Sequence, residues 1–265
     1  MNLRSEARLK RPRLGAAPRL VLRVLALALA LGAGALPARS QTSDAESRFN
    51  IALMHLREGR LDAAIEEFKK AVKQEPNNPF FLKGLGQAYA QKRKYKEAIE
   101  CFRKALQANP YYVDVRNDLG TALMLAGDRD EGKKEFLTAY GDPTNPTPEI
   151  SARNLGQAWM EEKNYAEALN WFRTTVNRNK GYPDGYLGMA DVYYNLGKVD
   201  EAITQLEAGL KELPDDAALQ VALGEACYKA GRFTDAKSHL EAAARQDVAG
   251  PYGRRAQQLL QGFPK

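Results

Sequence analysis

Apolar and small residues recur along most of this chain at helical spacing, and the helices that they predict come in pairs. The clearest stretch carries them at Leu82, Leu85, Gly86, Tyr89, Ala98, Phe102 and Ala105, and it ends at Asn109-Pro110. Spacings of three and four residues place side chains on one face of a helix. The stretch therefore predicts a helix, a tight turn, a second helix and a stop, because a proline disfavours helix in the residue before it.

This helix-turn-helix pattern is repeated. The small residue that follows an apolar residue in each first helix falls at Ala52, Gly86, Gly120, Gly156, Ala190 and Gly224. These positions are separated by 34, 34, 36, 34 and 34 residues. Such a period indicates a repeat architecture, in which each helix pair has an apolar face that it can bury only against its neighbours.

We call the positions that recur in each repeat slots. The residue types in these slots resemble those of the tetratricopeptide repeat (TPR) family, whose pattern runs W-x₂-L-G-x₂-Y…A-x₃-F…P. Leu85, Gly86, Tyr89, Ala98 and Phe102 match it closely. The resemblance implies an all-α fold, a right-handed α-solenoid of antiparallel helix pairs. It covers residues 45–250, which we divide into six repeats at 45–78, 79–112, 113–146, 149–182, 183–216 and 217–250.

The residue types in the slots fit this packing. A Gly or Ala in the first helix lets the second helix approach closely. Aromatic side chains at Phe68, Phe102, Phe136 and Phe172 are expected to fill the contact with the next repeat. Glycines at Gly59, Gly127, Gly197 and Gly231 are expected in the turns, with positive φ.

One segment interrupts the period. Residues 141–148 contain three prolines and add two residues between the third and fourth repeats, which excludes helix there. The segment is either a lengthened loop in one continuous solenoid or a seam between two three-repeat halves. Nearby, Gly132 replaces the expected alanine, which weakens that helix by about 1 kcal/mol. Residues 251–265 are predicted to form a polar-faced capping helix and a tail.

The first forty residues are predicted to be a signal peptide. A basic start is followed by the apolar run Val24 to Leu36, which is thirteen residues long and shorter than the ~20 of an ordinary membrane-spanning helix. Small residues at Ala38 and Ser40 fit cleavage after Ser40, with residues 41–44 as a polar lead-in. Two alternatives stay open: an uncleaved membrane anchor, and a later start site that shortens the basic region.

The net charge of +6 belongs to that first segment. Residues 1–40 hold eight basic residues and one acidic residue, so the rest of the chain carries a net charge of −1. This removes most of the case for a nucleic-acid partner. No membrane contact is expected beyond the signal segment. The expected location is periplasmic or secreted, or membrane-anchored if the segment is not cleaved.

No motif indicates catalysis, a cofactor or a metal. The chain has no G-x-S-x-G, Walker-type loop, H-E-x-x-H or G-x-G-x-x-G. The only cysteines, Cys101 and Cys227, lie in different repeats and are interpreted as packed helix residues. His55 takes an aromatic slot, and His239 has no partner in metal-binding spacing. We therefore expect a protein that is not an enzyme and has no cofactor.

The resemblance also implies which side chains face the groove of the solenoid, counted from the Gly or Ala slot. They are Phe49, Leu53, Lys83, Gln87, Asn117, Thr121, Arg153, Gln157, Leu187, Asp191, Tyr194, Val221, Glu225 and Tyr228. Family members that clamp the free carboxylate of chaperone tails use a Lys and Asn pair with further Asn and basic residues. Here Gln87 follows Lys83, and Asp114 and Asp118 oppose a carboxylate ligand, so the clamp is not carried over.

Two hypotheses of function follow. The first is a non-catalytic scaffold that binds peptide or protein partners in its groove, in the bacterial cell envelope. The second is a structural protein that self-associates into a homo-oligomer or an envelope assembly.

Overall fold

The computed structural model of the chain describes residues 43–263, which are all-α. Thirteen α-helices lie in this range. They are α2 (Asp44–Arg57), α3 (Leu61–Gln74), α4 (Pro79–Gln91), α5 (Tyr95–Ala108), α6 (Val113–Ala126), α7 (Arg129–Gly141), α8 (Pro148–Glu161), α9 (Tyr165–Arg178), α10 (Pro183–Asn195), α11 (Val199–Glu212), α12 (Ala217–Lys229), α13 (Phe233–Gln246) and α14 (Pro251–Gln261). The predicted signal peptide lies outside the described residues, among which no helix is long and apolar enough to cross a membrane.

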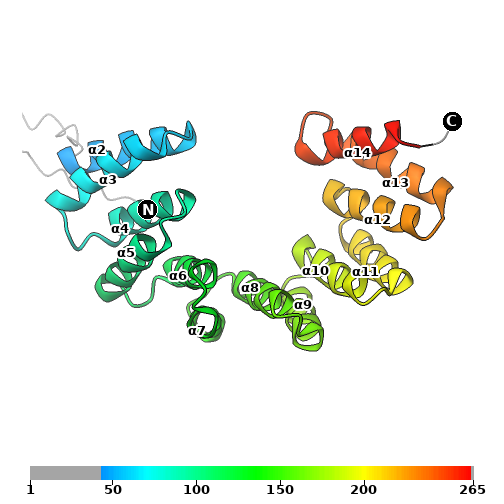
Figure 1. Cartoon of the computed structure of the whole chain (residues 1–265), viewed down its shortest axis with the longest axis horizontal. Helices are drawn as coiled ribbons and strands as arrows, with labels where there is room; N and C mark the ends of the chain where they lie inside the picture. The colour runs from blue at the N-terminus through cyan, green and yellow to red at the C-terminus, as the bar shows by residue number, and fades with distance from the viewer. Residues whose placement is uncertain (1–42, 264–265) are drawn as a thin grey trace, which may run out of the picture. The chain divides into compact units, whose positions relative to one another are not determined.

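The helices of Asp44–Lys265, one compact unit, form a helical-repeat solenoid (Figure 1). Each helix packs against the next one in the chain. The first helices of successive pairs, from α2 through α4, α6, α8, α10 and α12 to α14, also contact one another. The second helices, α3 to α13, make no such contacts with each other in the described range. The row therefore curves with its first helices on the inner side, which we call the concave surface.

Glycines in the first helices bring the paired helices close together, as predicted. A β-carbon built on Gly86 would lie 2.5 Å from a ring carbon of Phe102, and one on Gly156 would lie 2.7 Å from Phe172. Real β-carbons essentially never approach that closely, so any larger residue would push the helices apart. Phe172 also packs on the next repeat, where a β-carbon on Gly188 would lie 2.4 Å from its ring.

Gly132 has a role that the sequence did not indicate. A β-carbon there would lie 2.9 Å from the carbonyl oxygen of Gly120 and 2.9 Å from Cγ of Met124. The two glycines therefore face each other where α6 and α7 cross. With the present positions of the helices, a glycine at this position therefore allows their close approach.

The turns within the pairs share one backbone conformation. Gly59, Gly127 and Gly197 have φ of 73°, 100° and 72°, and Gly231 matches them, which confirms the prediction of positive φ. The equivalent turn positions of the second and fourth repeats hold Arg93 and Lys163, with φ of 61° and 58°. A residue with a β-carbon is less stable in the left-handed region by roughly 1–2 kcal/mol. The packing of the repeat therefore imposes this backbone conformation on Arg93 and Lys163.

Local signals set the helix starts. Pro79, Pro148, Pro183 and Pro251 occupy the first turn of α4, α8, α10 and α14, where a missing N–H costs no hydrogen bond. Asn78 caps α4, because its Oδ1 accepts hydrogen bonds from the backbone N–H groups of the next two non-proline residues.

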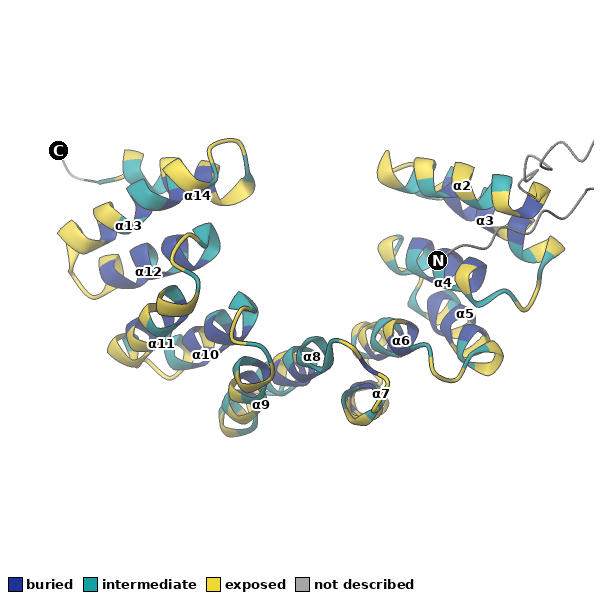
Figure 2. Cartoon of the chain, turned by 180° about the vertical axis from the view of Figure 1, so that it is seen from behind, coloured by how far each residue is buried: buried dark blue, intermediate teal, exposed yellow. Residues whose placement is uncertain are grey.

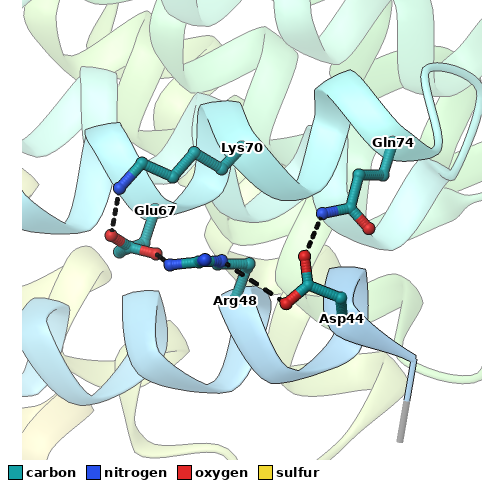
Figure 3. A network of polar contacts seen from close by, with 5 residues as sticks. All are labelled: Asp44, Arg48, Glu67, Lys70 and Gln74. Carbon is teal, nitrogen blue, oxygen red and sulfur yellow. Dashed lines mark hydrogen bonds and ion pairs between the residues drawn. The ribbon is translucent and has the colours of Figure 1, made fainter.

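A polar network joins α2 and α3 (Figure 3). Glu67 of α3 accepts hydrogen bonds from Arg48 Nη1 of α2 at 3.1 Å and from Lys70 Nζ at 2.7 Å. These two cations hold the pKa of Glu67 below its usual value, with the Lys70 hydrogen bond as the larger cause. Gln74 of α3 donates to Asp44 of α2, so polar bonds supplement the apolar contact of this pair.

Buried residues concentrate where the helices face one another (Figure 2). One large cluster runs from Leu82 of α4 through Phe102 of α5 to Leu123 of α6. Another runs from Ala168 of α9 to Ala236 of α13. Cys101 and Cys227 are free thiols within the apolar packing, and burial raises the pKa of Cys101 to about 11. Both cysteines are therefore packing residues, as predicted.

Candidate functional site

The concave surface is crossed by polar bonds between successive first helices. Lys83 Nζ of α4 donates to Asp114 of α6 at 3.2 Å, and one turn further along Gln87 Nε2 donates to Asp118 at 2.9 Å. The same geometry recurs two repeats later, where Arg153 Nε of α8 donates to an aspartate of α10 at 3.1 Å. Each of these bonds joins residues 31 apart in the chain.

These bonds set the electrostatics of the first half of the surface. Partial burial by itself lowers the pKa of Lys83, but Tyr112, Asp114 and Asp118 outweigh it and raise the pKa. Burial raises the pKa of Asp118 above its usual value, although the Gln87 hydrogen bond acts in the opposite direction. Lys83 and Gln87 are therefore already engaged within the protein.

The fourteen residues expected at the groove differ in how far they are exposed to solvent. Thr121, Gln157, Asp191 and Tyr228 are exposed, and nine others are partly buried. Val221 differs, because it is 7% exposed and packs with Leu240, Ala243 and Ala256. The assignment of Val221 to an open groove needs correction, since α14 covers this part of α12.

Two of the other expected groove residues contribute mainly to packing. The Phe49 ring stacks on Phe81 with centroids 5.0 Å apart and also contacts Phe68. Leu53 packs against the same apolar cluster of α2 to α5. The first repeat therefore uses these positions to join α2 to the rest of the row.

Tyr194 is also engaged, although its hydroxyl group lacks a hydrogen-bond partner within the described residues. Its ring lies 4.4 Å from Lys229 Nζ, a cation–π geometry. Burial raises the pKa of the Tyr194 hydroxyl, and the nearby carboxylates of Glu225 and Asp191 add to the shift. The hydroxyl is therefore a neutral group at neutral pH.

The middle of the concave surface contains two neighbouring hollows that share Arg153 and Gln157. The larger, of about 250 Å³, is lined by Arg153, Gln157, Phe172, Asp184, Leu187, Gly188 and Asp191. The smaller, of about 100 Å³, includes Thr121 and Glu161 in its lining. We call the two together the central hollow. It collects five of the expected groove residues: Thr121, Arg153, Gln157, Leu187 and Asp191.

A further pocket of about 450 Å³, the C-terminal pocket, lies where α12, α13 and α14 meet. Its apolar lining includes Leu240 and Phe263, and Tyr228 packs edge-on against Phe263 at 5.1 Å. At its rim, Arg255 of α14 donates to Glu225 of α12 at 2.8 and 3.0 Å. Leu240 stands in the slot that holds phenylalanine in the first four repeats, which the sequence could have indicated as a site of extra space.

The sequence pattern does not reveal the acidic partners in these bonds. It indicates Asp114 and Asp118 only as groups that oppose a carboxylate ligand, and it indicates no role for Asp184. Their signal was the recurring spacing of 31 residues from a donor in the preceding first helix. Among the described residues, no group of three or more His, Cys, Asp or Glu side chains could hold a metal ion.

Comparisons with known proteins agree with this architecture. Two family models described as tetratricopeptide repeat match the chain, one at residues 30–79, 50–113 and 117–185 and the other at 90–140 and 160–220. The crystal structure of PilW, a type IV pilus biogenesis factor, superposes with a TM-score of 0.62 at 18% identity, covering 81% of this chain and 99% of PilW.

The curated relatives are distant and mostly longer. The chain is 22% identical over 208 residues to the protein CTR9 homolog of Arabidopsis thaliana, covering 76% of this chain and 19% of that protein. It is 26% identical over 149 residues to the type IV pilus assembly protein PilF of Pseudomonas aeruginosa, covering 56% of this chain and 59% of PilF. In both cases the chain matches less than two thirds of the relative's length. The helix pairs, the slot residues and the family matches together show that the chain belongs to the tetratricopeptide repeat family.

Proposed function

We propose that this protein binds extended peptide segments of partner proteins on its concave surface, in the bacterial cell envelope. Proteins of the tetratricopeptide repeat family are protein-interaction scaffolds, and the chain has their fold. The observation that carries the proposal is the central hollow, where polar and apolar side chains from three first helices converge on open space. An extended segment lying across these helices would contact several repeats at once.

The envelope location has two supports. The apolar run before Ser40 has the features of an export signal. Of the similar proteins, PilF is a type IV pilus assembly protein and PilW is a type IV pilus biogenesis factor. Any partner of PilF or PilW is a property of those proteins and is not carried over to this chain. The location is tested directly by sequencing the N-terminus of the mature protein, which should begin at Gln41.

Binding on the concave surface is tested by placing a photo-cross-linking amino acid at Gln157 of α8 in the full chain, expressed in its native host. Gln107 of α5 provides the matched control, because it is also an exposed glutamine but lies on a second helix. Cross-links to the same partner protein are expected at Gln157 and not at Gln107. A partner that cross-links only at Gln107 would place binding on another surface.

The same experiment addresses self-association. Helix α2 exposes apolar side chains at Ile51 (39%) and Met54 (48%), which a second copy of the chain could cover. A cross-linked product of twice the chain mass, together with a mass that rises with concentration in light scattering, would favour this second function. A mass that stays monomeric across dilution would exclude it.

A further inference from the structure

One slot of the first helices carries a polar side chain in five of the six repeats. The residue directly after the Gly or Ala slot is Leu53 in α2, Gln87 in α4, Thr121 in α6, Gln157 in α8, Asp191 in α10 and Glu225 in α12. Gln87 bonds to Asp118 of the next first helix, and Glu225 bonds to Arg255 of the next first helix. In the second and sixth repeats, the slot residue is therefore bonded across to the neighbouring first helix. In the third repeat, the Thr121 hydroxyl donates to the Asn117 carbonyl of its own helix at 3.0 Å.

The fourth and fifth repeats differ. Within the described part of the chain, neither the Gln157 amide nor the Asp191 carboxylate makes a side-chain hydrogen bond or ion pair. Both line the larger part of the central hollow. Lys229 is the cation with an electrostatic effect on Asp191, but its Nζ lies over the Tyr194 ring. Unused hydrogen-bonding capacity therefore converges on one open space.

The charges around this space do not balance. Arg153 is the only cation among the described residues that line the central hollow, and it is paired with Asp184. Two further carboxylates of the lining, Asp191 and Glu161, have no cationic partner among the described residues. Partial desolvation raises the pKa of Asp191, Lys229 acts in the opposite direction, and the carboxylate of Glu225 adds to the rise.

The shape of the hollow also restricts its occupant. Its larger part, which Asp191 lines, has a volume of about 250 Å³. This volume lies below the range of roughly 300–1,000 Å³ typical of small-molecule sites, and it suits a single side chain. Leu187 and the ring of Phe172 provide apolar surface beside the carboxylate. A lysine or arginine has the matching structure, since its apolar stem packs on such surface while its charged end reaches a carboxylate.

We infer that the central hollow binds a lysine or arginine side chain of an extended partner segment, which pairs with Asp191 beside Gln157. The inference rests on the proposed function and specifies the chemistry of the partner. It also accounts for the absence of a carboxylate clamp here, because the surface is complementary to a basic segment instead of an acidic one. Charge complementarity of this kind selects partners as well as strengthening their binding.

The test uses a phage-displayed library of random dodecapeptides selected on the full chain. Gln157→Trp, which fills the hollow at an exposed position, identifies the peptides that bind there, because their binding should be lost. These peptides are expected to share a lysine or arginine at one position. Asp191→Asn should weaken them roughly tenfold, a typical effect of removing one partner of a partly desolvated charge pair. Replacing the basic residue of the peptide with methionine should have a similar effect.

Asp128→Asn is the matched control, because Asp128 is an exposed aspartate at the α6–α7 turn with no side-chain capping bond. It should leave affinity unchanged, and circular dichroism should show both aspartate variants folded. Hollow-binding peptides without a shared basic residue, or peptides insensitive to Asp191→Asn, would overturn this inference and leave the proposed function intact. A failure to select any peptide sensitive to Gln157→Trp would contradict the proposed function and this inference together.

Discussion

The junctions before and after the third repeat are built from different interactions. Between α5 and α6 the contact is apolar, and Phe102, Val115 and Leu119 of this cluster are at most 2% exposed. Between α7 and α8 the contact includes Lys133, whose Nζ donates to both Glu162 carboxylate oxygens at 2.7 and 2.8 Å. The same Nζ lies 4.0 Å from the centre of the Trp159 ring.

Buried polar groups gather at the second of these junctions. Of the five buried polar or charged residues in the described part of the chain, Lys133, Asn145 and Ser151 lie there. Asn145 Nδ2 donates to the Ala139 carbonyl at 2.7 Å, and its Oδ1 accepts from the Thr147 N–H at 2.9 Å. Neither of the two larger apolar clusters includes a buried residue of α7 or α8.

The difference follows from the extra residues of the 141–148 segment. A longer connection brings additional backbone N–H and C=O groups near the core, and these groups need hydrogen-bond partners. The Asn145 side chain is the partner of two such groups, the Ala139 carbonyl and the Thr147 N–H. Polar contacts are directional, so they define how the two repeats meet, but each contributes only about 0.5–1.5 kcal/mol net to stability. Whether this junction also divides the solenoid into two halves stays a prediction, and three substitutions test the comparison.

The largest effect is expected for Phe102→Ala in the apolar junction. Phe102 is 1% exposed and packs against Gly86, so truncation leaves a cavity that rigid helices cannot close. The free energy of unfolding should fall by about 3–5 kcal/mol, measured by urea denaturation followed by circular dichroism. Phe80→Ala is the control, because Phe80 is 59% exposed and its ring makes one edge-on contact, with Tyr112 at 5.5 Å. Its loss should reduce stability by less than about 1.5 kcal/mol. Equal losses of stability for Phe102→Ala and Phe80→Ala would mean that the apolar junction contributes no more to stability than an exposed contact does.

An intermediate effect is expected for Lys133→Met in the polar junction. The substitution keeps an apolar stem but leaves Glu162, whose side chain is 23% exposed, without its cationic partner. A loss of about 1–3 kcal/mol should follow.

Lys83→Met is the matched control in the apolar part of the row. Its partner Asp114 has a side chain that is 65% exposed, so the ion pair is screened by solvent. Its loss should cost less than about 1 kcal/mol. If Lys83→Met proved as costly as Lys133→Met, the proposed distinction between the two junctions would fail.

The smallest effect is expected for Asp118→Asn, at a polar bond that overlies the apolar junction. Burial raises the folded-state pKa of Asp118, so its stabilising contribution is present at low pH and is lost as pH rises through that pKa. The asparagine variant is uncharged and can still accept the Gln87 hydrogen bond. It should equal or exceed the wild type in stability at pH 7, by less than about 1 kcal/mol, and the difference should shrink near pH 4. A clear loss of stability at pH 7 would show that the ionised carboxylate is needed.

Much of the fold could be predicted from residue types alone. The slots at Gly86 and Phe102, the turn glycine Gly127 and the capping helix starting at Pro251 all occupy the structural positions expected of them. The reason is that every repeat needs a small residue where its helices cross, a bulky apolar residue beside it and a positive φ in its turn. Few residue types meet each of these requirements. The groove residues were less predictable, as Val221 and Phe49 show, because their exposure depends on which neighbouring helix covers them.

The sequence by itself therefore determined the helix pairs, their period and the close packing within each pair, because these depend on short-range spacing repeated along the chain. The tertiary structure alone decided which polar side chains are already bonded. Lys83 and Arg153 are paired with residues 31 positions away, whereas Gln157 and Asp191 line the central hollow. That distinction depends on how successive first helices align across the concave surface, and only their packing sets this alignment.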